Sequence, residues 1–107
     1  MQKHVHETLS ILSKRWTLHL IFVLLNGPLT FRELAKQMEG IGDPMLSERL
    51  KALVSEGLVA REVTITSPIR VSYSLTPEGY ALRPVVEAIE AWSVQRHQET
   101  ARSSSAP

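Results

Sequence analysis

The stretch "DPMLSERLKALVSEGLVARE", residues 43–62, reads as a short helix that runs into a strand. Leu46, Leu50 and Leu53 recur at helical spacing and lie within about 60° of one another on a helical wheel. They therefore predict a buried side, and the opposite side of the same helix is polar. The side chains that point most directly away from the leucines are those of Pro44, Glu48, Lys51 and Ser55.

Another short helix is predicted directly before this one, in "TFRELAKQMEGIG". Thr30 and Glu33 match a capping box, in which each side chain accepts a hydrogen bond from the backbone N–H of the other residue. Gly40 suits the left-handed position after a helix, and Asp43 with Pro44 suits the start of the next. Two short helices joined by about four residues form a helix-turn-helix.

A β-hairpin is predicted after Gly57, which suits the end of the second helix. "LVAREVTI" (58–65) is rich in β-branched residues, and "RVSYSL" (70–75) alternates apolar and polar residues. The intervening "TSPI" contains Pro68 and reads as a turn. A hairpin in this position is the wing of a winged helix-turn-helix.

The rest of the chain is predicted to be helical. Residues 5–14 carry apolar residues at helical spacing. "RWTLHLIFVLLNGP" is apolar nearly all round, which predicts a central helix buried on all sides. A cap, a proline and an acid at residues 76–78 restart a helix, and Pro84 divides it from a long helix over 84–101. The fold class is therefore mainly α with a small antiparallel β wing, a winged helix-turn-helix.

Length and composition indicate one soluble domain. The chain has 107 residues, of which 43% are apolar and 21% charged; we expect a domain over residues 1–102 and a disordered tail over residues 103–107. A net charge of +1 neither demands nor excludes a nucleic-acid partner. The longest apolar run, "LIFVLL", is far shorter than the ~20 residues of a membrane span, and no apolar signal segment opens the sequence. We expect a cytoplasmic protein with no membrane partner.

Reactive side chains are sparse. The chain has no cysteine, which excludes a disulfide, a thiolate metal site or a thiol switch within it. His4 and His6 have no further ligands to complete a metal site, and His19, on the apolar helix, is interpreted as a core histidine. No nucleophile elbow, phosphate loop or paired-carboxylate site is found. We therefore predict no enzyme activity, no metal and no cofactor.

The polar side of the 44–56 helix is the expected DNA-reading surface, because the second helix of such a pair enters the major groove. Ser47 can bond a base or a phosphate, Lys51 can hold a phosphate or a guanine, and Glu48 can accept from a cytosine amino group. The alternative is that these side chains are only solvated. Arg49, at the border of the core, suits a structural ion pair at least as well as a DNA contact.

Basic residues on neighbouring elements support the interpretation that this surface binds DNA. Arg70 stands beside Pro68 near the wing tip, and Arg61 lies on the first wing strand. Arg32 and Lys36 lie on the preceding helix, from which backbone contacts are common in this geometry. The competing interpretation is a winged-helix protein-interaction module without DNA binding.

The sequence resembles the HxlR family of bacterial and archaeal regulators, which is related to MarR-type winged helices. The resemblance is carried by "KRWTLHLIFVLLNGPLTFRELAKQMEGI", "MLSERLKALVSEGLVARE" and "PIRVSYSLTPEGYALRPVVEAIEAW", about three-quarters of the chain. It implies a sequence-specific double-stranded DNA-binding transcriptional regulator that acts as a homodimer. Many relatives sense oxidants or electrophiles through a cysteine before the first helix. This chain lacks it, so an effector response would not run through a cysteine.

Carried onto this sequence, the resemblance adds the wing around Ser67 to the expected contacts. The predicted DNA-binding residues are then Arg32, Lys36, Pro44, Met45, Ser47, Glu48, Arg49, Lys51, Ser67, Pro68 and Arg70.

The resemblance also implies that the first and last helices pair across a two-fold axis. Without a second copy, the apolar stripe of the last helix would face water on so small a domain. The alternative is that this stripe packs on the domain itself. The predicted dimer residues are Val5, Leu9, Leu12, Val85, Ile89 and Trp92. A further hypothesis is that Trp16, His19 and Trp92 line a pocket near this axis for an unknown small-molecule effector.

Overall fold

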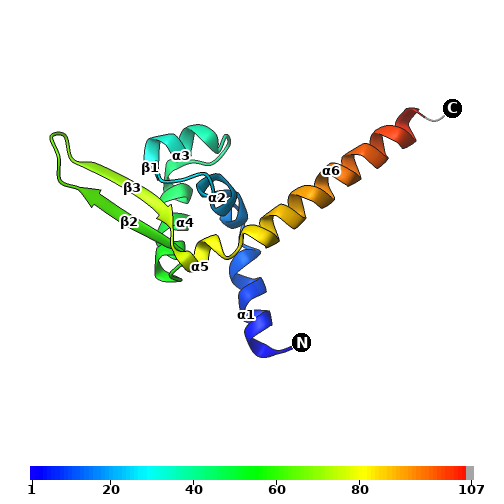
Figure 1. The fold of residues 1–107 in the computed structure, drawn as a ribbon, viewed down its shortest axis with the longest axis horizontal. Helices are drawn as coiled ribbons and strands as arrows, with labels where there is room; N and C mark the ends of the chain where they lie inside the picture. Colours follow the sequence, from blue (N-terminus) through cyan, green and yellow to red (C-terminus); the bar gives the residue numbers. More distant parts are fainter. Residues whose placement is uncertain (106–107) are drawn as a thin grey trace.

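The computed structural model describes residues 1–105, with side chains described through residue 103. Helices dominate, and one small sheet lies at the side of the helical body (Figure 1). The elements are α1 (Lys3–Leu12), α2 (Thr17–Leu24), β1 (Leu29–Thr30), α3 (Phe31–Gln37), α4 (Asp43–Ser55), β2 (Val59–Thr64), β3 (Arg70–Leu75), α5 (Pro77–Tyr80) and α6 (Arg83–Ser105). This order confirms the predicted winged helix-turn-helix.

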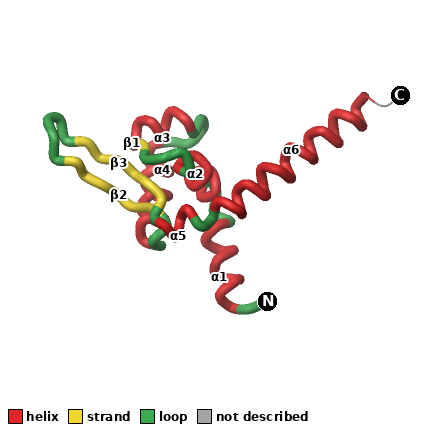
Figure 2. The backbone as a smooth tube through the Cα atoms, in the orientation of Figure 1, coloured by secondary structure: helices red, strands yellow, loops and turns green. Residues whose placement is uncertain are grey.

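The sheet is antiparallel in the order β1-β3-β2. Leu29 in β1 lies opposite Tyr73, and Val59 in β2 lies opposite Leu75, so the base of the sheet joins the core. The far end of the β2–β3 hairpin projects away from the helices, as the yellow strands of Figure 2 show. The hairpin is therefore a wing whose base is packed into the body and whose far end projects from it.

The three leucines of α4 form the centre of the core, as their spacing predicted. Leu46, Leu50 and Leu53 are at most 2% exposed. They belong to one apolar cluster with residues of α2 and α3. Burial of one such side chain stabilises the fold by about 2 kcal/mol, so together they fix the orientation of α4.

The predicted caps are formed, with one correction at α4. The Thr30 N–H donates to Glu33 Oε1 at 2.9 Å, and the Glu33 N–H donates to Thr30 Oγ1 at 3.2 Å. Gly40 and Gly57 adopt the expected left-handed φ values of 93° and 77°. The N-cap of α4 is Gly42 and not Asp43, which lies inside the first turn. There its carboxylate still suits the positive end of the helix dipole.

The expectation that the second helix is buried on all sides is wrong for one side of α2. Its inner residues are fully buried, but His19 is exposed and Phe22 is 44% exposed. The helix contacts α1, α3, β3 and α6. A domain of this size does not supply enough elements to surround a central helix completely.

The last helix is longer than predicted. α6 continues through Ser105, so residues 103–105, assigned to a disordered tail, are helical; residues 106–107 lie outside the described residues. Each added helical residue gains one backbone hydrogen bond, which lets a helix extend beyond its packed part. The radius of gyration is 16.6 Å, against about 13 Å for a compact domain of similar length, because α6 projects from the body (Figure 1). None of the helices in residues 1–105 has the length and apolarity needed to cross a membrane.

Candidate nucleic-acid interface

The outer side of α4 is free for a partner. Glu48, Lys51 and Ser55 are exposed, as is Pro44 in the first turn, and Ser47 is half-buried. Met45, also half-buried, flanks them. Because the three leucines hold the other side of the helix in the core, these side chains point away from the body. This is the polar surface that the sequence predicted for α4.

Arg49 faces the body, which favours the structural role that the sequence analysis left open beside a DNA contact. Its Nε donates to the Arg15 carbonyl oxygen at 2.8 Å, its Nη1 lies 3.9 Å from Glu48 Oε1, and its side chain is 15% exposed. Arg15 precedes Trp16, which adopts a left-handed φ of 77° that is rare for a non-glycine residue. Arg49 therefore ties the middle of α4 to the strained turn before α2.

A groove of about 190 Å³ separates α4 from the wing. Lys51 and Arg61 line it from opposite sides, with Tyr73, which pairs with Arg61 across the two wing strands. Its other lining residues are Ser47, Leu50 and Val54. The sequence analysis noted Arg61 but left it out of the DNA-binding set. Arg61 lies two residues after buried Val59 on β2, so the two side chains share one face of the strand. This spacing was the signal that Arg61 points toward the helices.

A second and more open groove, of about 600 Å³, lies between the start of α3 and the wing. Arg32 lines it from α3, and Pro68 and Arg70 line it from the wing. Ser67 is exposed at the tip, where the Ser67–Pro68 peptide bond is cis. Lys36 is exposed further along α3. The two grooves place basic side chains along the wing, Arg61 on β2 and Arg70 at the start of β3 next to the tip.

Arg70 is paired with the helix-turn-helix. Its Nη2 lies 3.4 Å from Glu33 Oε1, with both side chains about half exposed. The hydrogen bond from the Thr30 backbone N–H is the main cause that lowers the pKa of the Glu33 carboxyl; the Thr30 side chain and the Arg70 guanidinium lower it further. Glu33 is therefore charged at neutral pH and holds the wing arginine next to α3.

The hypothesised effector residues are only partly brought together. The rings of Trp16 and His19 lie 5.1 Å apart, and the Arg15 guanidinium lies over Trp16. His19 is exposed and is not the core histidine that was expected, because it occupies the uncovered side of α2. Trp92 is 62% exposed and lies under the guanidinium of Arg96 on α6.

Helices α1 and α6 carry exposed apolar side chains. Val5 and Leu9 of α1 are 38% and 50% exposed, and Val85, Ile89 and Trp92 of α6 are 42%, 47% and 62% exposed. Two other apolar residues of these helices face the domain's own core. Leu12 of α1 is partly buried against that core, and Val86 of α6, 5% exposed, anchors α6 in it.

Neither a metal-ligand cluster nor a buried polar side-chain atom without a partner is found in the described part of the chain. Among residues 1–105, no group of three or more His, Cys, Asp or Glu side chains is arranged to hold a metal ion. No buried side-chain nitrogen or oxygen there lacks a hydrogen-bond partner. The surface around α4 and the wing is therefore the candidate functional site.

The second helix of this helix-turn-helix is buried on one side and exposed on the other, and a wing with arginines flanks it. This arrangement is typical of DNA-binding transcriptional regulators. The family model described as HxlR-like helix-turn-helix matches residues 11–101. This chain belongs to that family, as the resemblance implied.

Curated relatives and solved structures agree. The chain is 42% identical over 89 residues to YvaP, an HTH-type transcriptional regulator of Bacillus subtilis, a match that covers 83% of this chain and 82% of that protein. The reduced form of the transcriptional regulator YodB from B. subtilis superposes with a TM-score of 0.81 at 38% identity, covering 89% of this chain and 93% of that one. The redox regulator HypR in its reduced form gives a TM-score of 0.82 at 30% identity, covering 94% and 99%.

Proposed function

We propose that this regulator acts as a homodimer that reads double-stranded DNA with the exposed side of α4. The observation that carries the proposal is the division of α4 into a fully buried leucine side and an exposed side with Ser47, Glu48 and Lys51. The two grooves that separate the wing from α3 and α4 add Arg32, Arg61 and Arg70. The exposed side of the helix would meet base edges, and the arginines would meet the phosphates that fix its register.

The dimer is supported by the exposed apolar side chains of α1 and α6. Val5, Leu9, Val85, Ile89 and Trp92 would leave water when two copies pack together, and each fully buried apolar side chain adds about 1.5–3 kcal/mol. Leu12 contributes to the domain's own core. Such a dimer would set two α4 helices about 34 Å apart, the spacing of successive major grooves.

Lys51→Ala is expected to weaken DNA binding by about tenfold and to make it less dependent on salt. The slope of log K against log salt should fall in magnitude by about 1, because one phosphate contact no longer releases a counterion. Fluorescence anisotropy with DNA from upstream of the gene, at several salt concentrations, measures both. Lys3→Ala removes the same charge from an exposed site on α1 and should leave affinity and slope unchanged. Binding by the parent chain that ignores salt would favour the protein-interaction alternative.

Ile89→Glu is expected to convert the dimer into monomers, because two carboxylates would enter an apolar interface. Sedimentation should then report the 12.0 kDa of one chain and not twice that mass. Ile89 is 47% exposed in the single chain, so its replacement should leave helicity by circular dichroism intact. Val94→Glu is the matched control. Val94 is similarly exposed but lies about 140° from Ile89 around α6, and that variant should stay dimeric. If both variants sediment like the parent chain, α6 does not form the interface.

A further inference from the structure

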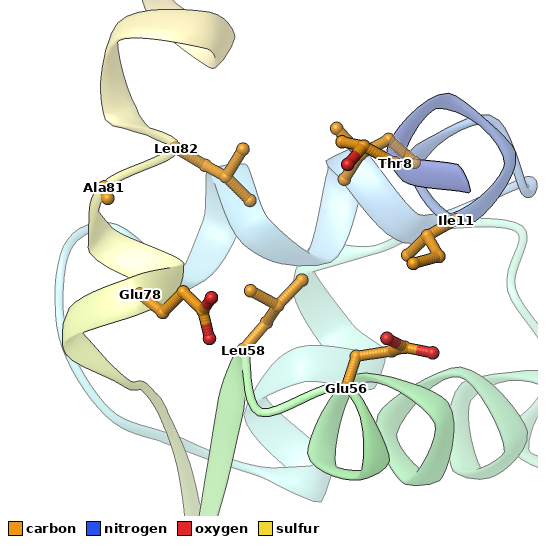
Figure 3. Close-up of a pocket in the computed structure, with 8 residues that line it drawn as sticks. Thr8, Ile11, Glu56, Leu58, Glu78, Ala81 and Leu82 are labelled. Atoms are coloured by element: carbon orange, nitrogen blue, oxygen red, sulfur yellow. The ribbon is translucent and has the colours of Figure 1, made fainter. Parts of the chain in front are cut away.

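A cavity of about 260 Å³ lies between α1, the turn after α4 and α5, away from the DNA-facing grooves. Figure 3 shows that its walls come from all three elements, with Leu58 and Leu82 projecting into the space between them. The lining residues are Thr8, Ile11, Leu12, Glu56, Leu58, Glu78, Ala81 and Leu82. At about 260 Å³ the cavity is slightly smaller than typical small-molecule sites, which begin at ~300 Å³.

The chemistry of the cavity is an apolar interior with acids at its edge. Ile11, Leu58 and Leu82 supply the interior, and the carboxylates of Glu56 and Glu78 lie on either side of Leu58 (Figure 3). Glu78 Oε2 lies 3.6 Å from the place where a Cβ on residue 57 would be, which sets this carboxylate over the turn that follows Glu56.

Neither carboxylate is neutralised within the described side chains. No hydrogen bond or ion pair reaches the carboxylate of Glu56 or of Glu78 there. Lys14 and Arg49 line a smaller neighbouring cavity of about 40 Å³ with Glu56, without an ion pair to it. Glu56 therefore has basic side chains in its neighbourhood, whereas no Lys or Arg lines the main cavity beside Glu78. The complement of this site is a molecule with one positive charge and an apolar body.

We propose that this cavity binds a small organic cation, an alkyl- or arylalkyl-ammonium, with its apolar body between Leu58 and Leu82 and its ammonium near Glu78 and Glu56. On a helical wheel, Ile11 lies about 160° from Leu9, whose side of α1 would face the second copy, so the Ile11 wall of the cavity points away from the proposed interface. Leu12, which also lines the cavity, packs against the domain's own core.

Binding of a ligand in this cavity would change the affinity of the chain for DNA. The lining joins α1, the C-terminal end of the DNA-reading helix and the α5 segment that leads into α6. A ligand wedged there would alter how α4 sits relative to the helices that set the spacing of two α4 helices. This role as an effector site rests on the proposed function; binding of the cation does not. By linkage, ligand and DNA must change each other's affinity by the same factor.

The binding test compares three probes with the same phenylethyl body: 2-phenylethylammonium, neutral 2-phenylethanol and anionic 3-phenylpropionate. Calorimetric titration of the full chain should give the cation at least about fivefold tighter binding than the other two, the gain that one or two partly exposed ion pairs provide. Glu78→Gln should abolish most of this preference, and Glu56→Gln a smaller part. Glu90→Gln, on the exposed surface of α6, is the matched control and should keep it. Thermal melts establish that each variant is folded.

Equal binding of the three probes, absence of cation binding, or a preference that survives in Glu78→Gln/Glu56→Gln would overturn the site. The DNA arm repeats the anisotropy titration with saturating 2-phenylethylammonium and expects a change in affinity of threefold or more. If the chain binds DNA with an affinity that the cation does not alter, the effector role is overturned. If the chain binds no DNA at all while the cation preference holds, the proposed function fails and the cation site stands.

Discussion

Leu50→Ala is expected to lower the free energy of unfolding by about 3 kcal/mol, the typical cost of removing a fully buried leucine side chain. Leu50 is 1% exposed and lies between Leu46 and Leu53 in the core under α4. Domains of this size are stable by only ~5–15 kcal/mol, so the loss is a large share of the total. Urea denaturation followed by circular dichroism measures it.

The neighbouring position supplies the control. Lys51→Ala, one residue further along α4 and exposed, should change the free energy of unfolding by less than about 0.5 kcal/mol while it weakens DNA binding. Leu50→Ala should instead lower the free energy of unfolding strongly and change DNA affinity little, when affinity is measured at a low temperature at which most of the variant is folded. A small stability loss in Leu50→Ala would mean that the leucine side of α4 is not the side that anchors it.

Gly79→Ala is expected to destabilise the fold by about 2–3 kcal/mol, because the added methyl group has no space. Gly79 is buried, and a Cβ built on it would overlap the Leu58 carbonyl oxygen. That oxygen accepts the Thr76 N–H at 3.1 Å, and the Thr76 hydroxyl donates to the Gly57 carbonyl at 2.6 Å. The backbone has to move to admit the methyl group, and these two bonds between α5 and the end of α4 would lengthen.

Gly42→Ala is the matched control for this change. Gly42 has a φ of −82°, which any residue adopts, and a Cβ there would meet only the Pro44 ring at an ordinary 3.7 Å. Its free energy of unfolding should stay within about 0.5 kcal/mol of the parent chain. Equal stability of Gly79→Ala and Gly42→Ala would show that the contact between α5 and Leu58 is loose.

The absence of cysteine bears on how this regulator is controlled. HypR, a structural relative, is a redox regulator. The 107 residues of this chain contain no thiol. A thiol-based signal is therefore excluded within this chain, and the proposed cation site beside α1 would provide a reversible, non-covalent alternative.

Sequence alone determined the elements of this protein and the buried side of α4. The capping box of Thr30 and Glu33, the left-handed Gly40 and Gly57, and the leucine spacing depend on residues only a few positions apart. Such signals are legible in one dimension because the backbone geometry of a helix end or a turn is local. The winged helix-turn-helix follows from their order.

Tertiary structure decided which side chains meet across elements. Arg49 turns to the Arg15 carbonyl 34 residues away, and Arg70 pairs with Glu33 across 37 residues. The exposure of His19 and the crowding at Gly79 arise in the same way, as does the cavity between α1 and α5. Each depends on how closely two distant segments pack and at what angle. Spacing along one segment carries no information on that, so these features required the folded chain.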